Sequence, residues 1–99
     1  MKKVLVQFNI PGMTAKQYDQ TWTDLRAAGQ ANPKGLLNHF GAHNGNDWLV
    51  VDVWESAEAF NKFGETLLPI LSKNGVAKAE PVVTPVYYEY SATPVSSAR

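Results

Sequence analysis

The stretch WLVVDVWESAEAF, residues 48–60, decides the fold, because a strand pattern changes into a helix pattern inside it. Side chains up to Trp54 alternate between two faces, as they do in a β-strand. Ser56 then offers an N-cap oxygen, and Glu55 and Glu58 place negative charge near the positive end of the helix dipole. A strand that leads directly into a helix predicts a fold of mixed α and β structure.

The two faces of this predicted strand differ in chemistry. One face is aliphatic and the other combines indoles with a carboxylate; their residues are Leu49, Val51 and Val53 on the first and Trp48, Val50, Asp52 and Trp54 on the second. We expect the aliphatic face to pack against the helices of the fold. The face with the indoles and the carboxylate is then a surface that awaits a partner.

A chain of 99 residues is expected to form one domain, which buries only about 60–65% of its unfolded surface in one modest core. We expect this domain to span residues 1–90. Residues 91–99 are mostly small, which predicts a C-terminal tail that is loose or lies as an arm over an interface.

Charge and composition exclude several classes of function. Basic and acidic residues number nine each, so no net charge attracts nucleic acid or an anionic membrane. The chain has no cysteine, which excludes disulfides and thiolate chemistry. No apolar run approaches the roughly 20 residues that a membrane span needs. We therefore expect a cytoplasmic protein with neither a nucleic-acid nor a membrane partner.

Local patterns predict the remaining elements. They are strands over residues 3–10, 36–43 and 82–90 and helices over residues 15–28 and 57–74. Thr14 and Gln17 match a capping box at the start of the first helix. Pro69 predicts a kink or a break near Leu68 in the second helix. Pro85 places the last strand at a sheet edge.

The order strand, helix, strand, strand, helix, strand predicts an α+β protein with the ferredoxin-like βαββαβ topology and a four-stranded antiparallel sheet. A hairpin turn at residues 45–46 sets the pairing of the two central strands. His39 then lies opposite Asp52, and Leu37 lies opposite Trp54, on one side of the sheet.

Two helices cover only one face of such a sheet. The other face is expected to carry Leu5, Leu37, Trp48, Val50 and Trp54. This is more apolar surface than a soluble monomer usually exposes in one patch. We therefore predict a homodimer whose sheets pack face to face and bury about 2,000 Å² or more.

Several segments together resemble one known superfamily. They are VLVQFNI followed by PGMTAKQYD, then NPKGLLNH, and above all VVDVWESAEAFNKF followed by LPIL and NGV. Up to about residue 90 the chain resembles the dimeric α/β-barrel superfamily and, within it, the antibiotic biosynthesis monooxygenase-like group. That group includes short stand-alone proteins without an assigned activity. The resemblance implies a dimeric α/β barrel.

His39 and Asp52 are the sharpest candidates for catalysis. A carboxylate opposite an imidazole fixes the tautomer of the ring and makes it a better proton acceptor, which suits a general base. The alternative is a polar contact inside a dimer interface. Asn9 ends the first strand, where the resemblance implies a polar group that orients an oxygenated substrate; it is equally well explained as a strand-end residue that satisfies a turn.

Aromatic side chains are the candidates for a substrate pocket. Trp22, Trp54 and Phe63 can stack on an aromatic ligand, although core packing is the commoner reason for such residues in a small protein. His39 and His43 are four residues apart, which spans about 13 Å in a strand, so they cannot share a metal ion. We expect no metal site.

The resemblance also bears on cofactors. The superfamily contains haem-degrading monooxygenases, but Phe63 stands where their pattern has a Trp, and residues 70–74 contain no His to bind iron. We expect no cofactor. If the protein is an enzyme, the resemblance implies cofactor-independent oxygenation of a small aromatic, such as a quinol or polyketide-like compound. The alternative is a non-catalytic ligand-binding or scaffold homodimer.

Overall fold

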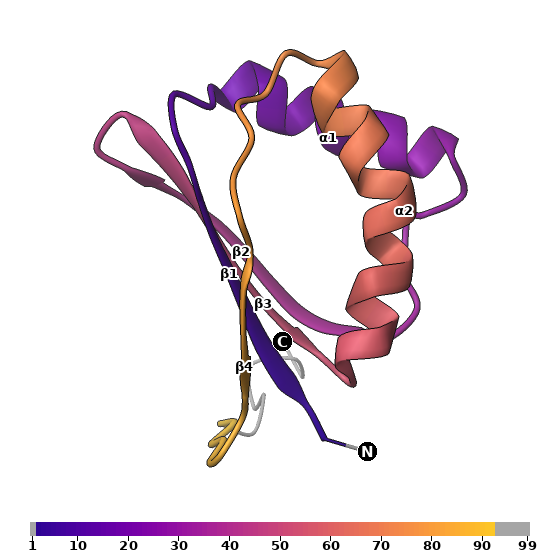
Figure 1. Cartoon of the computed structure of the whole chain (residues 1–99), viewed down its shortest axis with the longest axis vertical. Coiled ribbons are helices and arrows are strands. Elements are labelled where there is room, and N and C mark those ends of the chain that lie inside the picture. Colours follow the sequence, from indigo (N-terminus) through magenta and orange to yellow (C-terminus); the bar gives the residue numbers. More distant parts are fainter. Residues whose placement is uncertain (1, 93–99) are drawn as a thin grey trace, which may run out of the picture.

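The computed structural model describes residues 2–92 and contains one sheet covered on one face by two helices (Figure 1). The elements in chain order are β1 (Val4–Ile10), α1 (Ala15–Ala27), β2 (Leu36–Asn44), β3 (Asp47–Trp54), α2 (Ala57–Lys73) and β4 (Val82–Pro85). The strand order is β2-β3-β1-β4, and all neighbouring strands are antiparallel. The predicted α+β, ferredoxin-like βαββαβ fold is confirmed.

The helix starts follow the predicted caps. The Thr14 hydroxyl accepts a hydrogen bond from the Gln17 amide at 3.1 Å, and the Gln17 side chain accepts one from the Thr14 amide at 3.0 Å. Ser56 caps α2 through a 3.1 Å bond from the Ala59 amide. Of the predicted kink or break near Leu68, the break does not occur, because α2 continues through Pro69 as one helix. Packing of its apolar stripe on the sheet outweighs the missing hydrogen bond.

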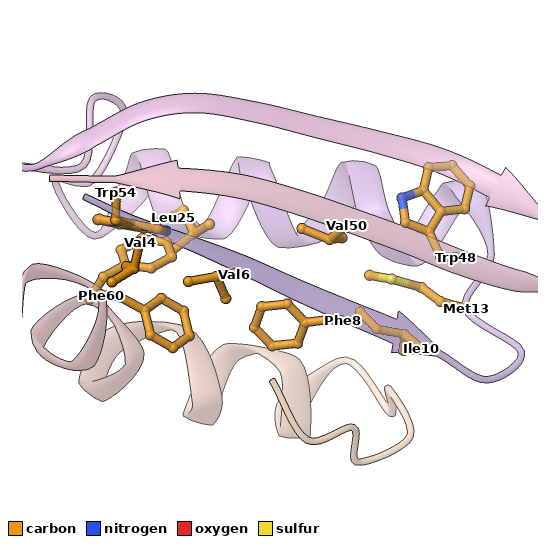
Figure 2. Close-up of a cluster of buried hydrophobic side chains, with 11 residues drawn as sticks. Val4, Val6, Phe8, Ile10, Met13, Leu25, Trp48, Val50, Trp54 and Phe60 are labelled. Carbon is orange, nitrogen blue, oxygen red and sulfur yellow. The ribbon is translucent and has the colours of Figure 1, made fainter. Parts of the chain in front are cut away.

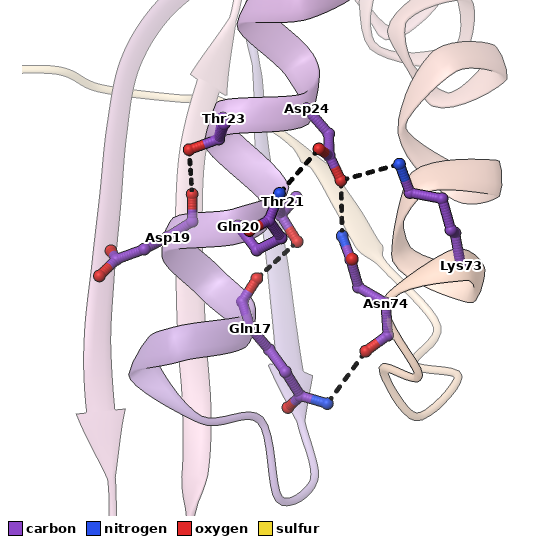
Figure 3. A network of polar contacts seen from close by, with 8 residues as sticks. All are labelled: Gln17, Asp19, Gln20, Thr21, Thr23, Asp24, Lys73 and Asn74. Atoms are coloured by element: carbon purple, nitrogen blue, oxygen red, sulfur yellow. Dashed lines mark hydrogen bonds and ion pairs between the residues drawn. The ribbon is translucent and has the colours of Figure 1, made fainter.

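A polar network joins the C-terminal end of α2 to the middle of α1 (Figure 3). The Asp24 carboxylate accepts hydrogen bonds from the Asn74 amide and the Lys73 ammonium, each at 3.1 Å. Gln17 donates to the Asn74 carbonyl at 3.2 Å. These bonds, led by the one from Asn74, hold the pKa of the Asp24 carboxyl below its usual value. The network fixes the position of α1 over the sheet.

The predicted register of the β2–β3 hairpin is confirmed over most of its length. His39 lies opposite Asp52, and the pairing continues to the turn. The prediction that Leu37 faces Trp54 is wrong, because a bulge between Leu36 and Asn38 places Leu36 opposite Trp54. One extra residue in a strand changes the pairing on one side of the bulge only.

The assignment of the two faces of β3 is wrong. Trp48, Val50, Asp52 and Trp54 are buried and face the helices, whereas the aliphatic residues between them lie on the outer face. β1 decides the outcome: its buried residues Val4, Val6, Phe8 and Ile10 are the register partners of the four buried residues of β3. Both sets contribute to the single core beneath the helices (Figure 2).

The physical reason lies in the size of the indoles and the pairing of the carboxylate. A buried Trp removes about 150–250 Å² from water, more than a Val or Leu does. The Asp52 oxygens accept hydrogen bonds within the core, so the carboxylate is buried at little cost. A carboxylate with fixed partners does not identify the solvent side of a strand.

The outer sheet face therefore carries different residues from those expected. Of the predicted set, Leu5 lies on this face and Leu37 is exposed, but Trp48, Val50 and Trp54 are buried. The apolar side chains that this face presents are Leu5, Phe40, Leu49, Val51, Val53 and Val82. Phe40 is 62% exposed, so the face is still apolar and uncovered. We refer to these six residues as the outer face.

The last strand is shorter than the predicted residues 82–90. β4 lies at the sheet edge, as its prolines predict, but it ends at Pro85, which pairs with Val4. The amide of Val86 still donates to the Lys3 carbonyl at 3.0 Å, and beyond that point β1 offers no partner. Most of the predicted tail, residues 93–99, lies outside the described residues. Neither described helix is long and apolar enough to cross a membrane.

Candidate functional site

A histidine and a carboxylate from adjacent strands form the centre of the candidate site. His39 Nδ1 of β2 lies 2.6 Å from Asp52 Oδ1 of β3. The second carboxylate oxygen, Oδ2, accepts a 3.1 Å hydrogen bond from the indole N–H of Trp54, two residues along the same face. Asp52 is only 5% exposed, so the carboxylate is shielded from water, whereas the His39 side chain is 21% exposed. The carboxylate is held from both sides before any ligand arrives.

Tyr18 of α1 completes the arrangement from above. Its hydroxyl oxygen lies 2.6 Å from His39 Nε2. Burial raises the pKa of the Tyr18 phenol, and the nearby charge of Asp52 raises it further, so the phenol keeps its proton at neutral pH. When the ring is neutral, the hydroxyl donates to Nε2 and Nδ1 donates to the carboxylate. The result is a continuous chain of hydrogen bonds from Tyr18 through His39 to Asp52.

The place of the Tyr18 ring depends on a glycine. A Cβ atom built on Gly41 would lie 2.6 Å from the Tyr18 hydroxyl oxygen and 2.7 Å from its Cζ atom. Gly41 is opposite Val50 on the face beneath the helices. The ring also stacks on Trp48 with a centroid separation of 4.7 Å. Tyr18 therefore fills the space that any larger residue at position 41 would occupy.

An apolar cavity of about 50 Å³ lies between the helices and the sheet beside this chain. Tyr18, Thr21, His39 and Asp52 contribute the polar part of its wall, with the Thr21 hydroxyl bonded to the Gln17 carbonyl of its own helix. Trp22 and Phe63 contribute aromatic walls from the two helices. Trp22 also meets the His39 ring edge-on at 5.1 Å. Polar groups that converge on an apolar cavity are typical of a small-ligand site.

A larger hollow of about 550 Å³ adjoins the first between α2 and the segment that leads into β4. Phe8, Ile10 and Leu71 line both spaces. Ligand pockets usually measure about 300–1,000 Å³, so the larger space has the volume of a ligand site and the smaller one does not. The shared side chains are the wall between the two spaces.

The predicted site residues separate into two groups. His39, Asp52, Trp22 and Phe63 come together at the cavity, whereas Trp54 does not line it and lies wholly buried beside Asp52. Asn9 is on the opposite face of the sheet, where its side chain bonds to those of Asp47 and Asn44 at 3.0 Å each. Asn9 is thus joined to residues of the hairpin and is not at the cavity.

Tyr18 is the polar site residue that the sequence reasoning missed, because it fits the apolar stripe of α1. The available signal was Gly41, two residues beyond His39 on the same face of β2. A glycine beside a histidine on a covered face leaves room for a long side chain from the helix above. No other signal in the sequence distinguishes a phenol that bonds from one that only packs.

The two histidines do not share a metal site in the described part of the chain. His43 packs edge-on against Trp48 with a centroid separation of 4.4 Å and is not part of the His39 site. Within residues 2–92, no three His, Cys, Asp or Glu side chains come together as a metal-binding group. The donors that the site offers are therefore one imidazole, one carboxylate and one phenol.

Comparison with known proteins places the fold. The sequence matches no family model. No curated protein matches it either. Among solved structures, the chain is similar to SnoaB, a cofactor-independent oxygenase from Streptomyces nogalater, with a TM-score of 0.64 and 16% identity over 95% of this chain and 99% of that one.

Two further structures have the same fold. One is a dimeric ferredoxin-like protein from an uncultured marine organism, with a TM-score of 0.63 and 14% identity over 94% of this chain and 95% of that one. The other is a candidate antibiotic biosynthesis monooxygenase from Caulobacter crescentus, with a TM-score of 0.62 and 17% identity over 90% and 92% of the two chains. The predicted resemblance to the monooxygenase-like group is thus confirmed as a likeness of fold.

Proposed function

We propose that this protein is a cofactor-independent oxygenase of a small, electron-rich aromatic compound. The observation that carries the proposal is the His39–Asp52 pair, whose carboxylate is buried, in the wall of an apolar cavity. An imidazole oriented by a carboxylate is a general base, and the carboxylate stabilises the imidazolium that forms. The fold likeness to SnoaB, a cofactor-independent oxygenase, supports the same class of chemistry.

The base has a defined task in such a reaction. It removes a proton from a phenol or an enol, and the resulting anion is electron-rich enough to react with dioxygen directly. For an anthrone-like substrate the balance is simple: a ring CH₂ and O₂ become a ring C=O and water. The protein supplies orientation, an apolar space and stabilisation of the anion.

The substrate needs more room than the smaller cavity has. The adjoining hollow of about 550 Å³ is the proposed entry, and the ring is placed against Trp22 and Phe63 when the shared wall moves aside. Leu71 of α2 is half-buried and belongs to this wall, so a change of its rotamer joins the two spaces.

A homodimer through the outer face is the second part of the proposal. Six apolar side chains on one uncovered sheet face exceed what a monomer usually leaves in contact with water. The similar structures include a dimeric ferredoxin-like protein. The site lies on the other side of the sheet, so the dimer buries the apolar face without closing the cavity.

Oxygen uptake with quinols and anthrone-like compounds tests the proposed activity. We expect uptake by the unchanged protein and at least about a 100-fold loss in a His39→Ala, Asp52→Ala double variant, because general base catalysis contributes about 10²–10⁴-fold. His43→Gln is the matched control, since His43 is exposed and has no carboxylate partner among the described residues. Uptake that is equal in the double variant and the control would end the proposal.

One observation favours a second candidate function. Both nitrogens of His39 already have partners, and the adjacent cavity is only about 50 Å³. Both features are expected if the hydrogen-bonded chain is structural. The protein would then bind a ligand without catalysis or serve as a scaffold dimer. Thermal stabilisation by phenols without any oxygen uptake would favour this binding function. A ligand at 100 times its dissociation constant adds about 2.7 kcal/mol to the free energy of unfolding.

A further inference from the structure

We propose that Tyr18 is the residue that contacts the substrate, that its hydroxyl passes the substrate proton to His39, and that Gly41 exists to make room for it. This inference rests on the proposed oxygenase function and identifies its substrates as hydroxyl-bearing aromatics. In this mechanism His39 receives the proton without contacting the substrate.

Both ring nitrogens of His39 already have partners. Nδ1 lies in a 2.6 Å hydrogen bond with the Asp52 carboxylate, and the Tyr18 oxygen lies 2.6 Å from Nε2. The ring is further enclosed by Trp22, which meets it edge-on at 5.1 Å. A substrate in the cavity therefore reaches the basic nitrogen only through the Tyr18 hydroxyl.

The hydrogen-bonding capacity of the Tyr18 hydroxyl determines what it can bind. A tyrosine hydroxyl has one proton to donate and two lone pairs with which to accept. The proton is directed to His39 and one lone pair accepts from the Trp22 indole, so the other lone pair is left for a donor, and Tyr18 lines the cavity where a substrate would lie. The group that fits this position is an O–H, which donates a short and directional hydrogen bond, and not a C–H. The substrate class is thus a phenol, a quinol or the enol form of an anthrone.

The proton transfer balances without any free phenolate on the protein. The substrate O–H bond breaks as a new O–H bond forms on Tyr18, and the former Tyr18 proton moves to Nε2 of His39. Tyr18 is a phenol before and after, the substrate is an anion, and His39 is an imidazolium beside Asp52. Burial raises the pKa of Tyr18, which is compatible with a residue that never rests as a phenolate. The new positive charge on His39 lies next to the Asp52 carboxylate, which also accepts a hydrogen bond from Trp54.

The position of the Tyr18 ring is set by residues of the sheet. The ring is held between its stack on Trp48 and the bare backbone of Gly41. Gly41 has no positive φ angle, so the backbone conformation does not require a glycine at this position. The close approach of the phenol, at 2.6–2.9 Å from a Cβ that is absent, does explain it. Gly41 is therefore a positioning residue.

Ionisation of bound 4-nitrophenol tests the relay without oxygen chemistry, because its anion absorbs visible light. We expect the unchanged protein to bind the probe as the anion below the pH at which the probe ionises in solution. Tyr18→Phe should lower the ionisation constant of the bound probe at least 10-fold and change its affinity as a neutral phenol only a few-fold. Gly41→Ala should cause the same loss, because its Cβ displaces the hydroxyl.

Gly64→Ala is the matched control, since a Cβ at Gly64 of α2 meets nothing within 4 Å, and it should ionise the probe normally. If Tyr18→Phe ionises the probe as well as the unchanged protein does while His39→Gln does not, the relay is wrong and the proposed base survives. If the unchanged protein does not ionise the probe at all, the proposed function fails and the relay fails with it. Should Gly41→Ala not fold, Tyr18→Phe alone decides.

Discussion

Replacing Trp54 by Phe tests how much the buried Asp52 depends on its indole partner. The change removes the 3.1 Å hydrogen bond to the carboxylate from a side chain with no exposed surface. A hydrogen bond to a charged group contributes about 1.5–3 kcal/mol. The ring atoms lost from the core add about 1.5 kcal/mol at about 0.8 kcal/mol for each buried carbon. We expect the free energy of unfolding to fall by about 3–4.5 kcal/mol.

Trp48→Phe is the matched control, because the same atoms are removed from the other end of β3. The Trp48 indole nitrogen is buried and has no hydrogen-bond partner among the described residues. Its removal costs the same ring atoms but relieves an unpaired donor, which is worth about 1–3 kcal/mol. The two terms nearly cancel, so we expect a change close to zero.

Urea unfolding at one fixed protein concentration, followed by far-ultraviolet circular dichroism, measures the difference. With a slope of about 1.5 kcal/mol per molar urea, a gap of about 3 kcal/mol separates the two midpoints by about 2 M. The fixed concentration matters because a dimer gains stability with concentration. Equal midpoints for the two variants would refute the reasoning, since they would show that the indole bond does not stabilise the buried carboxylate.

Three further predictions concern titration and assembly. The pKa of Tyr18 is raised in the folded state, so the protonated phenol contributes its full stabilisation below about pH 10, and this contribution is lost as the pH rises through the folded pKa. In Tyr18→Phe the free energy of unfolding should therefore fall less steeply with alkaline pH. The pKa of Asp24 is lowered, chiefly by Asn74, so its contribution is present above about pH 4 and lost in acid, and Asp24→Asn should flatten the acid side of the same profile. Light scattering should give a dimer for the unchanged chain and for Leu68→Glu on exposed α2 surface, but a monomer for Leu5→Glu on the outer face; a dimer in both variants would contradict that interface.

Much of the candidate site was accessible from the sequence because it depends on register. The hairpin turn sets which residues of β2 and β3 are opposite, and side chains alternate with a period of two. His39 therefore had to meet Asp52, as it does at 2.6 Å. Local chemistry likewise predicted the caps at Thr14 and Ser56.

The third member of the site was not accessible in this way. Tyr18 belongs to a helix, and helical spacing shows only that it shares a face with the apolar residues around it. Whether its hydroxyl reaches His39 depends on the distance between α1 and the sheet, which Gly41 and the contacts of Asp24 with α2 determine. Such a distance is a property of packing between elements.

The sequence by itself determined the order of the elements, the ferredoxin-like topology and the register that joins His39 to Asp52, because these depend on short-range patterns along the chain. Only the tertiary structure decided which side of the sheet the helices cover. That choice depends on the burial of whole faces. The indoles of β3 and the apolar side chains of β1 together remove more surface from water than the aliphatic face would. The hydrogen bonds of Asp52 allow its carboxylate to be buried with them. The cavity, the place of Tyr18 beside it and the exposed outer face all follow from that decision.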